Sequence, residues 1–339
     1  MKQKARWRAA AALMIAAMFC AGCETSRAVQ APETRNESAA FPDELYLESE
    51  AGQILEIPLE EVPLAEAPAV ASFAMPKADG VTVYSNTKAA IDASNTSDGY
   101  VMIKYTGSSK QALKVLITGP SGVTYTYNLN IDGGYEVFPL SDGDGAYKMG
   151  VYQNISGTKY TTLFSKTVSV KLKDEFAPFL LPNQYVNYTE KSAVVKKAAE
   201  LTKNCKDELE KVAVVYDYVI NTLTYDKEKA KTVKSGYLPV VDEVLKEKKG
   251  ICFDYAALMA AMLRSQNVPT KLVVGYTGDI YHAWLNTYSQ EKGWVEGVIF
   301  FDGITWKLMD PTFASSAKSN DKILEYIGNG DNYTAKFLY

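Results

Sequence analysis

Apolar and polar residues alternate in short segments between Val81 and Lys173, as in ALKVLITG and VTYTYNLN. Turn-forming sequences such as GPSG, DGG and SDGDG separate these segments at regular intervals. Alternation with a period of two, interrupted by such turns, is typical of half-buried strands in antiparallel sheets. The pattern therefore predicts an antiparallel β-sandwich of about seven strands over residues 80–173.

C-terminal to this region, the apolar residues begin to recur at helical spacing. This spacing predicts helices over residues 189–203, 206–224 and 241–249, and a fourth helix over 252–267 that a proline then ends. Strand-like segments follow, with turns between them: KLVVGYT, HAWLNTY, WVEGVIFF and ITWKLMD. Helices first and a meander afterwards predict an α+β domain over residues 174–339.

The N-terminal segment is first basic and then apolar, with MKQKARWR ahead of a hydrophobic run that ends at Gly22. The run is too short to span a bilayer as a helix, and its basic flank is typical of an export signal. It closes with Cys-Ala-Gly-Cys, which resembles the bacterial lipoprotein signal, although Cys20 stands where leucine is usual. Residues 1–22 are therefore predicted to be a lipoprotein signal peptide, and an ordinary cleaved secretory peptide is the alternative.

The same resemblance implies that Cys23 is lipidated. Two or more acyl chains would anchor the exported protein stably to the extracytoplasmic side of the membrane. Residues 23–79 are rich in Ala, Pro and Glu, and their acidic residues outnumber the basic ones. This composition, without a sustained helical period, predicts a solvated tether between the membrane and the folded part.

Length and charge narrow the classes of function. A chain of 339 residues is longer than one average domain, which agrees with two folded units plus a tether. The net charge is −4 at pH 7, and no cluster of Lys and Arg is interleaved with aromatic residues, so nucleic-acid binding is excluded. The sequence implies no cofactor and does not determine an oligomeric state.

Cys252 lies at the predicted start of a helix, two residues after Gly250. A free cysteine is often a buried hydrophobe, so packing alone is one interpretation. The other is a nucleophile, because the N–H groups and dipole of a helix N-terminus favour a thiolate, and glycine permits a tight turn beside it. Cys205 has no partner histidine and is interpreted as structural, with a disulfide to Cys252 as the alternative.

His282 is the only histidine in the chain, so only this residue can supply an imidazole base to a cysteine nucleophile. It begins the segment HAWLNTY, and a structural or surface role is the alternative. Asp310 ends ITWKLMD directly before a proline, where it can accept a hydrogen bond from the imidazole or simply initiate an Asp-Pro turn. The order Cys252, His282, Asp310 along helix, strand and strand favours a catalytic triad over three unrelated roles.

The segments GICFDYAALMAAMLRSQNVPTKLVVGY, HAWLNTY and WKLMDPT resemble the core of the transglutaminase-like superfamily. That family has a papain-like α+β fold and uses a Cys-His-Asp triad for acyl transfer. The resemblance covers residues 249–313 and implies Cys252 as nucleophile, His282 as general base and acid, and Asp310 as the orienting carboxylate. Phe253 stands where animal members have tryptophan, and no acidic loop matches their calcium site, so calcium dependence is not implied.

Further candidates surround this predicted triad. The backbone N–H of Cys252 and the side chain of Tyr225 are predicted to bind an oxyanion, although packing explains Tyr225 equally well. Trp284 is predicted to line the cleft beside His282, with core packing as its alternative. In the sandwich, LSDGDGAYKMGVYQN resembles the tyrosine corner of immunoglobulin-like domains, and its Asp residues at 142 and 144 indicate a hairpin turn rather than a calcium site.

Two classes of function fit these features. The first is a cell-surface, thiol-dependent acyl-transfer enzyme that acts on peptide or carboxamide bonds, with hydrolysis slightly favoured over transfer to an amine. The alternative is a surface lipoprotein that binds or spaces other molecules and carries a vestigial triad, which the sandwich favours. The sequence names no particular substrate.

Overall fold

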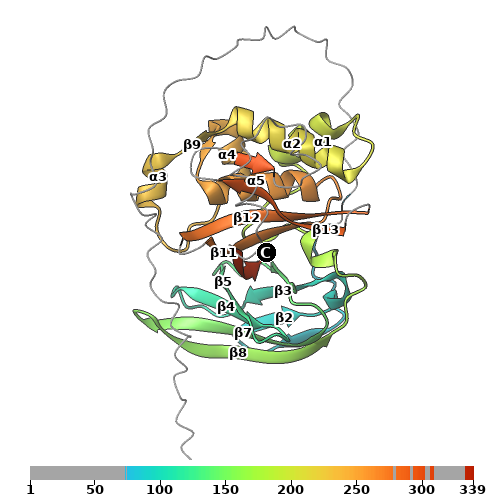
Figure 1. Ribbon diagram of the computed structural model, residues 1–339. Helices are drawn as coiled ribbons and strands as arrows, with labels where there is room; N and C mark the ends of the chain where they lie inside the picture. The colour runs from blue at the N-terminus through green and yellow to red at the C-terminus, as the bar shows by residue number, and fades with distance from the viewer. Residues whose placement is uncertain (1–72, 74, 278–279, 291–292, 302–305, 309–332) are drawn as a thin grey trace, which may run out of the picture.

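The computed structural model describes residues 73, 75–277, 280–290, 293–301, 306–308 and 333–339. The predicted signal peptide, nearly all of the predicted tether, Cys23 and Asp310 lie outside these residues. The described chain has a mixed α+β architecture with antiparallel sheets at its N-terminal end. Figure 1 shows these sheets at the bottom and the helices with their own sheet above them.

The N-terminal region consists of eight strands in two antiparallel sheets within the described chain. The first sheet has the order β1-β2-β3-β6 and the second the order β5-β4-β7-β8. Their bounds are β1 Val83–Ser85, β2 Ala89–Asp92, β3 Tyr100–Tyr105, β6 Glu136–Pro139, β4 Leu113–Thr118, β5 Thr124–Leu129, β7 Gly145–Ser156 and β8 Lys159–Val170. The prediction of antiparallel strands over this region is confirmed.

Side chains from the two sheets form one core. The rings of Tyr127 on β5 and Phe138 on β6 meet edge to face with their centroids 5.2 Å apart. Every second residue of β4 and β5 is buried, as the alternating sequence predicts. Strand β2 was not predicted, because all four residues of Ala89–Asp92 are buried and the segment shows no alternation.

The predicted corner contains a tyrosine whose hydroxyl closes the turn before β7. Tyr147 accepts a hydrogen bond from the backbone N–H of Asp142 and donates one to the carbonyl of Gly143, both at 2.8 Å. The carboxylate of Asp142 accepts from the N–H and hydroxyl of Ser121, and that of Asp144 accepts from the N–H of Leu172. Both carboxylates therefore bind distant segments, and the predicted hairpin is wrong because residues 140–144 connect β6 of the first sheet to β7 of the second.

Five α-helices follow in the described residues, and the last of them is central. The helices are α1 Ala193–Thr202, α2 Glu208–Thr222, α3 Lys227–Thr232, α4 Val241–Glu247 and α5 Cys252–Arg264. Helices α1, α2 and α4 pack against α5, which is buried along nearly its whole length. The helix predicted from Cys252 begins at that residue but ends earlier than predicted, and the short, lysine-rich α3 was not predicted.

One face of α5 packs on strands β11 and β12 of a five-stranded antiparallel sheet. The sheet order is β14-β13-β12-β11-β15, and a separate parallel pair joins β9 to β10. The bounds are β9 Thr224–Tyr225, β10 Lys249–Gly250, β11 Thr270–Thr277, β12 Ile280–Ser289, β13 Gly293–Phe301, β14 Trp306–Leu308 and β15 Tyr333–Leu338. The meander of β11 to β14 confirms the predicted strands, whereas β15 was not predicted.

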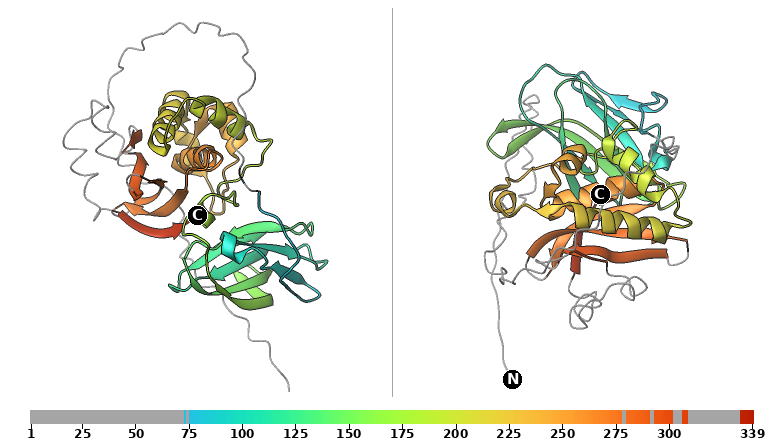
Figure 2. Two further views of the ribbon diagram at one scale, coloured as in Figure 1. Left: turned by 90° about the vertical axis from the view of Figure 1, so that its right-hand side faces the viewer. Right: turned by 90° about the horizontal axis from the view of Figure 1, so that it is seen from above.

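An aromatic cluster joins the two regions. The ring of Tyr339 lies 4.0 Å from that of Tyr185 and within 6 Å of Tyr125 and Tyr127 on β5, centroid to centroid. Figure 2 shows the C-terminal end between the sandwich and the sheet. Among the described residues, no helix combines the length and apolar character needed to cross a bilayer.

Candidate active site

The first turn of α5 is built around Cys252. The Asp254 carboxylate accepts a hydrogen bond of 2.9 Å from the backbone N–H of Ile251, which satisfies one of the free donors at the helix start. A Cβ at Gly250 would lie 2.6 Å from the Asp254 Cβ, so only glycine fits there without a shift. The structure thus explains this glycine by the close approach of a side chain.

Tyr225 lies beside the turn that leads into Cys252. In the parallel β9–β10 pair Tyr225 stands opposite Gly250, and the N–H of Asp226 donates to the Gly250 carbonyl at 2.8 Å. The Tyr225 ring also lies near that of Tyr255 on the next turn of α5, with centroids 6.5 Å apart. The structure therefore places Tyr225 opposite the glycine that stands two residues before the candidate nucleophile, and its role as an oxyanion donor stays a prediction.

His282 and Trp284 are two residues apart on β12, so their side chains project from the same face of the sheet. Both are buried, with His282 7% exposed and Trp284 3%. Gly275 stands opposite His282 on β11, and a Cβ there would lie 2.9 Å from the Trp284 ring. The Thr334 carbonyl, which is nearer still, and the indole together leave no room for a Cβ at Gly275. Both roles predicted for Trp284 remain compatible with this position.

The thiol of Cys252 lies against β12. The backbone N–H of Ala283 interacts with the Cys252 sulfur, and Ala283 directly follows His282 in the chain. Burial raises the pKa of the Cys252 thiol to about 12, while the N–H groups of Ala283, Phe253 and Cys252 itself act in the opposite direction. The Cys252 side chain is only 3% exposed. At neutral pH the site therefore holds a thiol rather than a thiolate.

Burial also favours the uncharged form of the histidine. It lowers the pKa of His282 to about 4, so the imidazole is neutral at pH 7. A neutral imidazole can take the proton of a thiol within its reach as the sulfur attacks a carbonyl carbon. The pair is therefore suited to general-base activation of the nucleophile, and the charges appear only during the reaction.

Other predicted residues are placed as follows. Asp310 lies outside the described residues, so the third member of the triad stays a prediction. Cys205 lies in the turn between α1 and α2, and both Cys205 and Cys252 are free thiols, so the alternative of a disulfide between them is wrong. Within the described part of the chain no three His, Cys, Asp or Glu side chains gather as a metal site would require.

A polar cluster that was not predicted lies under the same turn. The Asp254 carboxylate is completely buried and accepts hydrogen bonds from Lys229 Nζ at 2.7 Å and from the Tyr237 hydroxyl at 2.5 Å. The only sequence signal is an isolated acidic residue inside the apolar run that follows Cys252. Such a residue requires a partner when it is buried, but the sequence does not say which.

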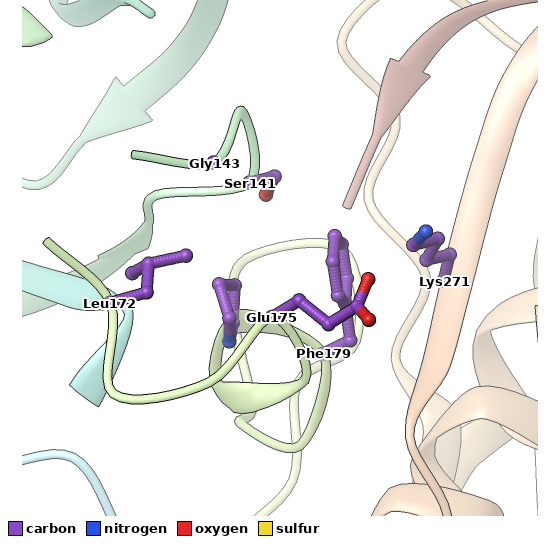
Figure 3. A pocket seen from close by; sticks show the side chains of 7 residues that line it. Ser141, Gly143, Leu172, Glu175, Phe179 and Lys271 are labelled. Carbon is purple, nitrogen blue, oxygen red and sulfur yellow. The ribbon is translucent and has the colours of Figure 1, made fainter. Parts of the chain in front are cut away.

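A pocket of about 130 Å³ lies elsewhere, at the junction between the sandwich and the C-terminal sheet. Figure 3 shows Lys271 and Glu175 on its walls, and both contact Trp294: the ammonium lies 3.6 Å from the ring centroid, and the carboxylate accepts the indole N–H at 3.1 Å. Its lining residues are Ser141, Gly143, Leu172, Glu175, Pro178, Phe179 and Lys271. Among the described residues, none of those predicted for catalysis lines it.

A comparison with models of known protein families finds a match over the part of the chain that includes α5, β11 and β12. Residues 195–297 match the family model of the transglutaminase-like superfamily. The chain contains a transglutaminase-like superfamily domain. The matched segment includes Cys252 and His282, whereas Asp310 and the N-terminal sheets lie outside it.

Three curated relatives are similar to part of the chain. Uncharacterized protein YebA of Bacillus subtilis is 27% identical over 192 residues, which cover 50% of this chain and 26% of YebA. UPF0252 protein MJ1282 of Methanocaldococcus jannaschii is 26% identical over 196 residues, 54% of each chain. Kyphoscoliosis peptidase of Mus musculus is 25% identical over 152 residues, 44% of this chain and 21% of the peptidase. The chain thus matches about half or less of each relative.

Proposed function

We propose that this protein is a thiol-dependent acyl-transfer enzyme that acts on peptide or carboxamide bonds. Cys252 is the nucleophile, His282 the general base and acid, and Asp310 the carboxylate that orients the imidazole. The observation that supports this most strongly is the placement of the Cys252 thiol at the start of α5, against the backbone N–H that follows His282 on β12. The match of the transglutaminase-like superfamily over this segment supports it independently.

In this proposal the reaction proceeds in two steps. The Cys252 sulfur bonds to the carbonyl carbon while its proton passes to the His282 imidazole, and the imidazolium then protonates the departing amine. The resulting thioester is cleaved by water, whose proton His282 takes, and the thiol is restored. The backbone N–H of Cys252 and the hydroxyl of Tyr225 stabilise the oxyanion in both steps.

Hydrolysis is favoured over transfer to an amine. The named activity among the three relatives is that of a peptidase, which supports peptide bonds as substrates. The test is a product survey with the wild type and Cys252→Ala, using a peptide library and a labelled primary amine with a glutamine-containing peptide. We expect cleavage by the wild type alone and no amine incorporation. Incorporation without cleavage would make the enzyme a transferase, and equal activity of Cys252→Ala would refute thiol catalysis.

One observation favours the second candidate, a binding or structural protein with a vestigial triad. Cys252 and His282 are both buried, and burial disfavours the charged form of each. A substrate must therefore gain access to the thiol before reaction. The absence of any product in the survey described above, together with unchanged binding of peptides by Cys252→Ala, would support this candidate.

The cellular setting belongs to the same proposal. Residues 1–22 act as a lipoprotein signal peptide, Cys23 carries the lipid, and residues 23–79 hold the enzyme off the extracytoplasmic face of the membrane. Residues 80–173 form an immunoglobulin-like sandwich, which the Tyr147 corner supports, and residues 174–339 form the papain-like catalytic domain. Detergent-phase partitioning tests the anchor, because Cys23→Ser should move the protein into the aqueous phase.

A further inference from the structure

The buried Asp254 carboxylate stands two residues after Cys252, on the first turn of α5. It is 0% exposed, and three groups donate hydrogen bonds to it: the N–H of Ile251, the Tyr237 hydroxyl and the Lys229 ammonium. A buried carboxylate without such partners would lose several kcal/mol of solvation or take up a proton. These three contacts therefore satisfy the buried carboxylate.

Lys229 supplies the only ion pair to Asp254 among the described residues. Its ammonium lies 2.7 Å from Asp254 Oδ2, 2.6 Å from the Tyr237 hydroxyl and 4.3 Å from the centroid of the Tyr237 ring. The lysine side chain is 30% exposed whereas Asp254 is fully buried. The pair thus connects the interior of the candidate site to the protein surface through one side chain.

The helix that carries Lys229 is fastened to the nucleophile turn at a second point. Asp226 caps α3 by accepting the N–H of Lys229 at 2.9 Å, and its own N–H donates to the Gly250 carbonyl at 2.8 Å. Lys249, beside Gly250, also lies 3.2 Å from the Asp226 carboxylate. Because α3 contacts the turn both before and after Cys252, the position of Lys229 and that of the thiol are linked.

The charges around the thiol have opposite effects on it. The charge of Asp254 disfavours the thiolate of Cys252, whereas an ammonium paired with that carboxylate offsets the effect. Burial keeps the imidazole of His282, on β12, neutral. On the outer side, Tyr237 is held in its neutral form by burial and Asp254, and also senses Glu243 and Glu247 of α4.

We propose that Lys229 is a positioning residue for the candidate nucleophile: by clamping and neutralising the buried carboxylate of Asp254, it fixes the first turn of α5 and promotes formation of the thiolate at Cys252. The proposal rests on Cys252 as the nucleophile of the proposed function. Its test measures the reactivity of the thiol itself, so it can succeed or fail independently of turnover.

The test is a double-mutant cycle on the full chain. Alkylation of Cys252 by iodoacetamide is followed at pH 8 by mass spectrometry of the peptide that contains it, in the wild type, Lys229→Met, Asp254→Asn and the double variant. We expect Lys229→Met to slow alkylation about tenfold and Asp254→Asn to speed it about tenfold, as a change of one pKa unit gives. The double variant should return to within about threefold of the wild type.

A change of the alkylation rate in opposite directions in the two single variants distinguishes positioning by charge from loss of structure. If both single variants change the rate in the same direction, or if neither changes it, the proposal is refuted. Lys231→Met, on an exposed position of the same helix, serves as the matched control and should leave the rate unchanged. Lys229→Arg keeps the charge and should retain a rate within about threefold of the wild type.

Circular dichroism identifies a variant that does not fold. If Lys229→Met is unfolded, the other two variants test the proposal. An unchanged alkylation rate in Lys229→Arg together with a faster rate in Asp254→Asn supports it, and any other pair of results overturns it. If Cys252→Ala keeps full peptide cleavage while the cycle gives the expected signs, the proposed function fails but the link between Lys229 and the thiol holds.

Discussion

The two ends of helix α5 each bury a charged side chain, but they satisfy it in different ways. At the N-terminal end, Asp254 is paired with a partly exposed lysine and a tyrosine. At the C-terminal end, the fully buried Arg264 donates to the backbone carbonyls of Leu181, Thr270 and Tyr339. A side-chain partner can change its charge or move, whereas backbone carbonyls are fixed by the fold.

This difference assigns separate tasks to the ends of one helix. Arg264 ties together the segment after the sandwich, the start of β11 and the residue after β15, so it holds the two regions in place. Asp254 stands two residues after Cys252, and we propose that its ion pair with Lys229 adjusts the reactivity of the thiol. We therefore expect changes at the C-terminal end to affect mainly stability, and changes at the N-terminal end to affect mainly the reactivity of the proposed nucleophile.

The largest expected effect comes from Arg264→Met, which breaks the C-terminal end. It removes the guanidinium hydrogen bonds to three carbonyls, of which that of Tyr339 keeps the Leu272 N–H as a donor, and we expect a loss of about 3–5 kcal/mol in the free energy of unfolding. Urea unfolding measures it, with Arg264→Lys as the matched variant that keeps the charge and part of the hydrogen bonding. A loss below about 1 kcal/mol for Arg264→Met would show that the C-terminal end does not depend on this residue.

A change of pH should affect the stability contributed by the region around Cys252 and that contributed by Arg264 differently, without a mutation. The pKa of His282 is about 4 in the folded state, below its ordinary value, so the unfolded chain binds a proton first as the pH falls below about 6.5. The contribution of the neutral His282 to the free energy of unfolding is therefore full above that pH, and it falls by up to about 3 kcal/mol toward pH 4. Burial lowers the pKa of Arg264 only to about 10, so the C-terminal end is unaffected in this window.

The measurement is urea unfolding at pH 7 and pH 4.5. The wild type should lose more stability between these values than His282→Asn, because the variant has no imidazole left to titrate. Since His282 is the only histidine, this comparison isolates it from the carboxylates, which titrate in both proteins. An identical loss in both proteins would contradict the burial of a neutral imidazole.

The smallest effect is expected from Gly250→Ala at the N-terminal end. The added Cβ would lie 2.6 Å from the Asp254 Cβ, and overpacking of this kind costs about 1–3 kcal/mol. We expect a larger fractional loss of peptide cleavage than of stability, because the clash displaces the turn that holds Cys252. The matched control is Gly134→Ala in the sandwich, whose nearest neighbour would be the flexible Asp132 carboxylate at 3.2 Å. Equal effects of both variants on cleavage would contradict this account.

The sequence predicted those elements whose pattern is local. The alternation of β4 and β5 and the helical spacing up to Arg264 result from one buried face per element, and such periodicity is visible in a single sequence. Strand β2 lacks it because every residue is buried, and α3 is too short and too charged to show an apolar face. Strand β15 depends on pairing with β11 far away in the chain.

The same distinction applies to the candidate site. Cys252 and His282 were predicted because cysteine and histidine are rare in this chain and stand in a recognisable order. Lys229 and Tyr237 were missed because their importance comes from a tertiary contact with Asp254, and lysines are frequent in the surrounding sequence. Residues that adjust a nucleophile through a second residue require a structure to be found.

The pairing of Cys252 with His282 is tested most directly by acylation of the protein with an activated peptide p-nitrophenyl ester at pH 7, followed by mass spectrometry. We predict a thioester on Cys252 that forms about 100-fold or more faster in the wild type than in His282→Asn, as general-base catalysis gives, with no comparable adduct on Cys205. Equal rates in both proteins, or labelling of Cys205 as fast as Cys252, would contradict the assignment of the two residues as nucleophile and base.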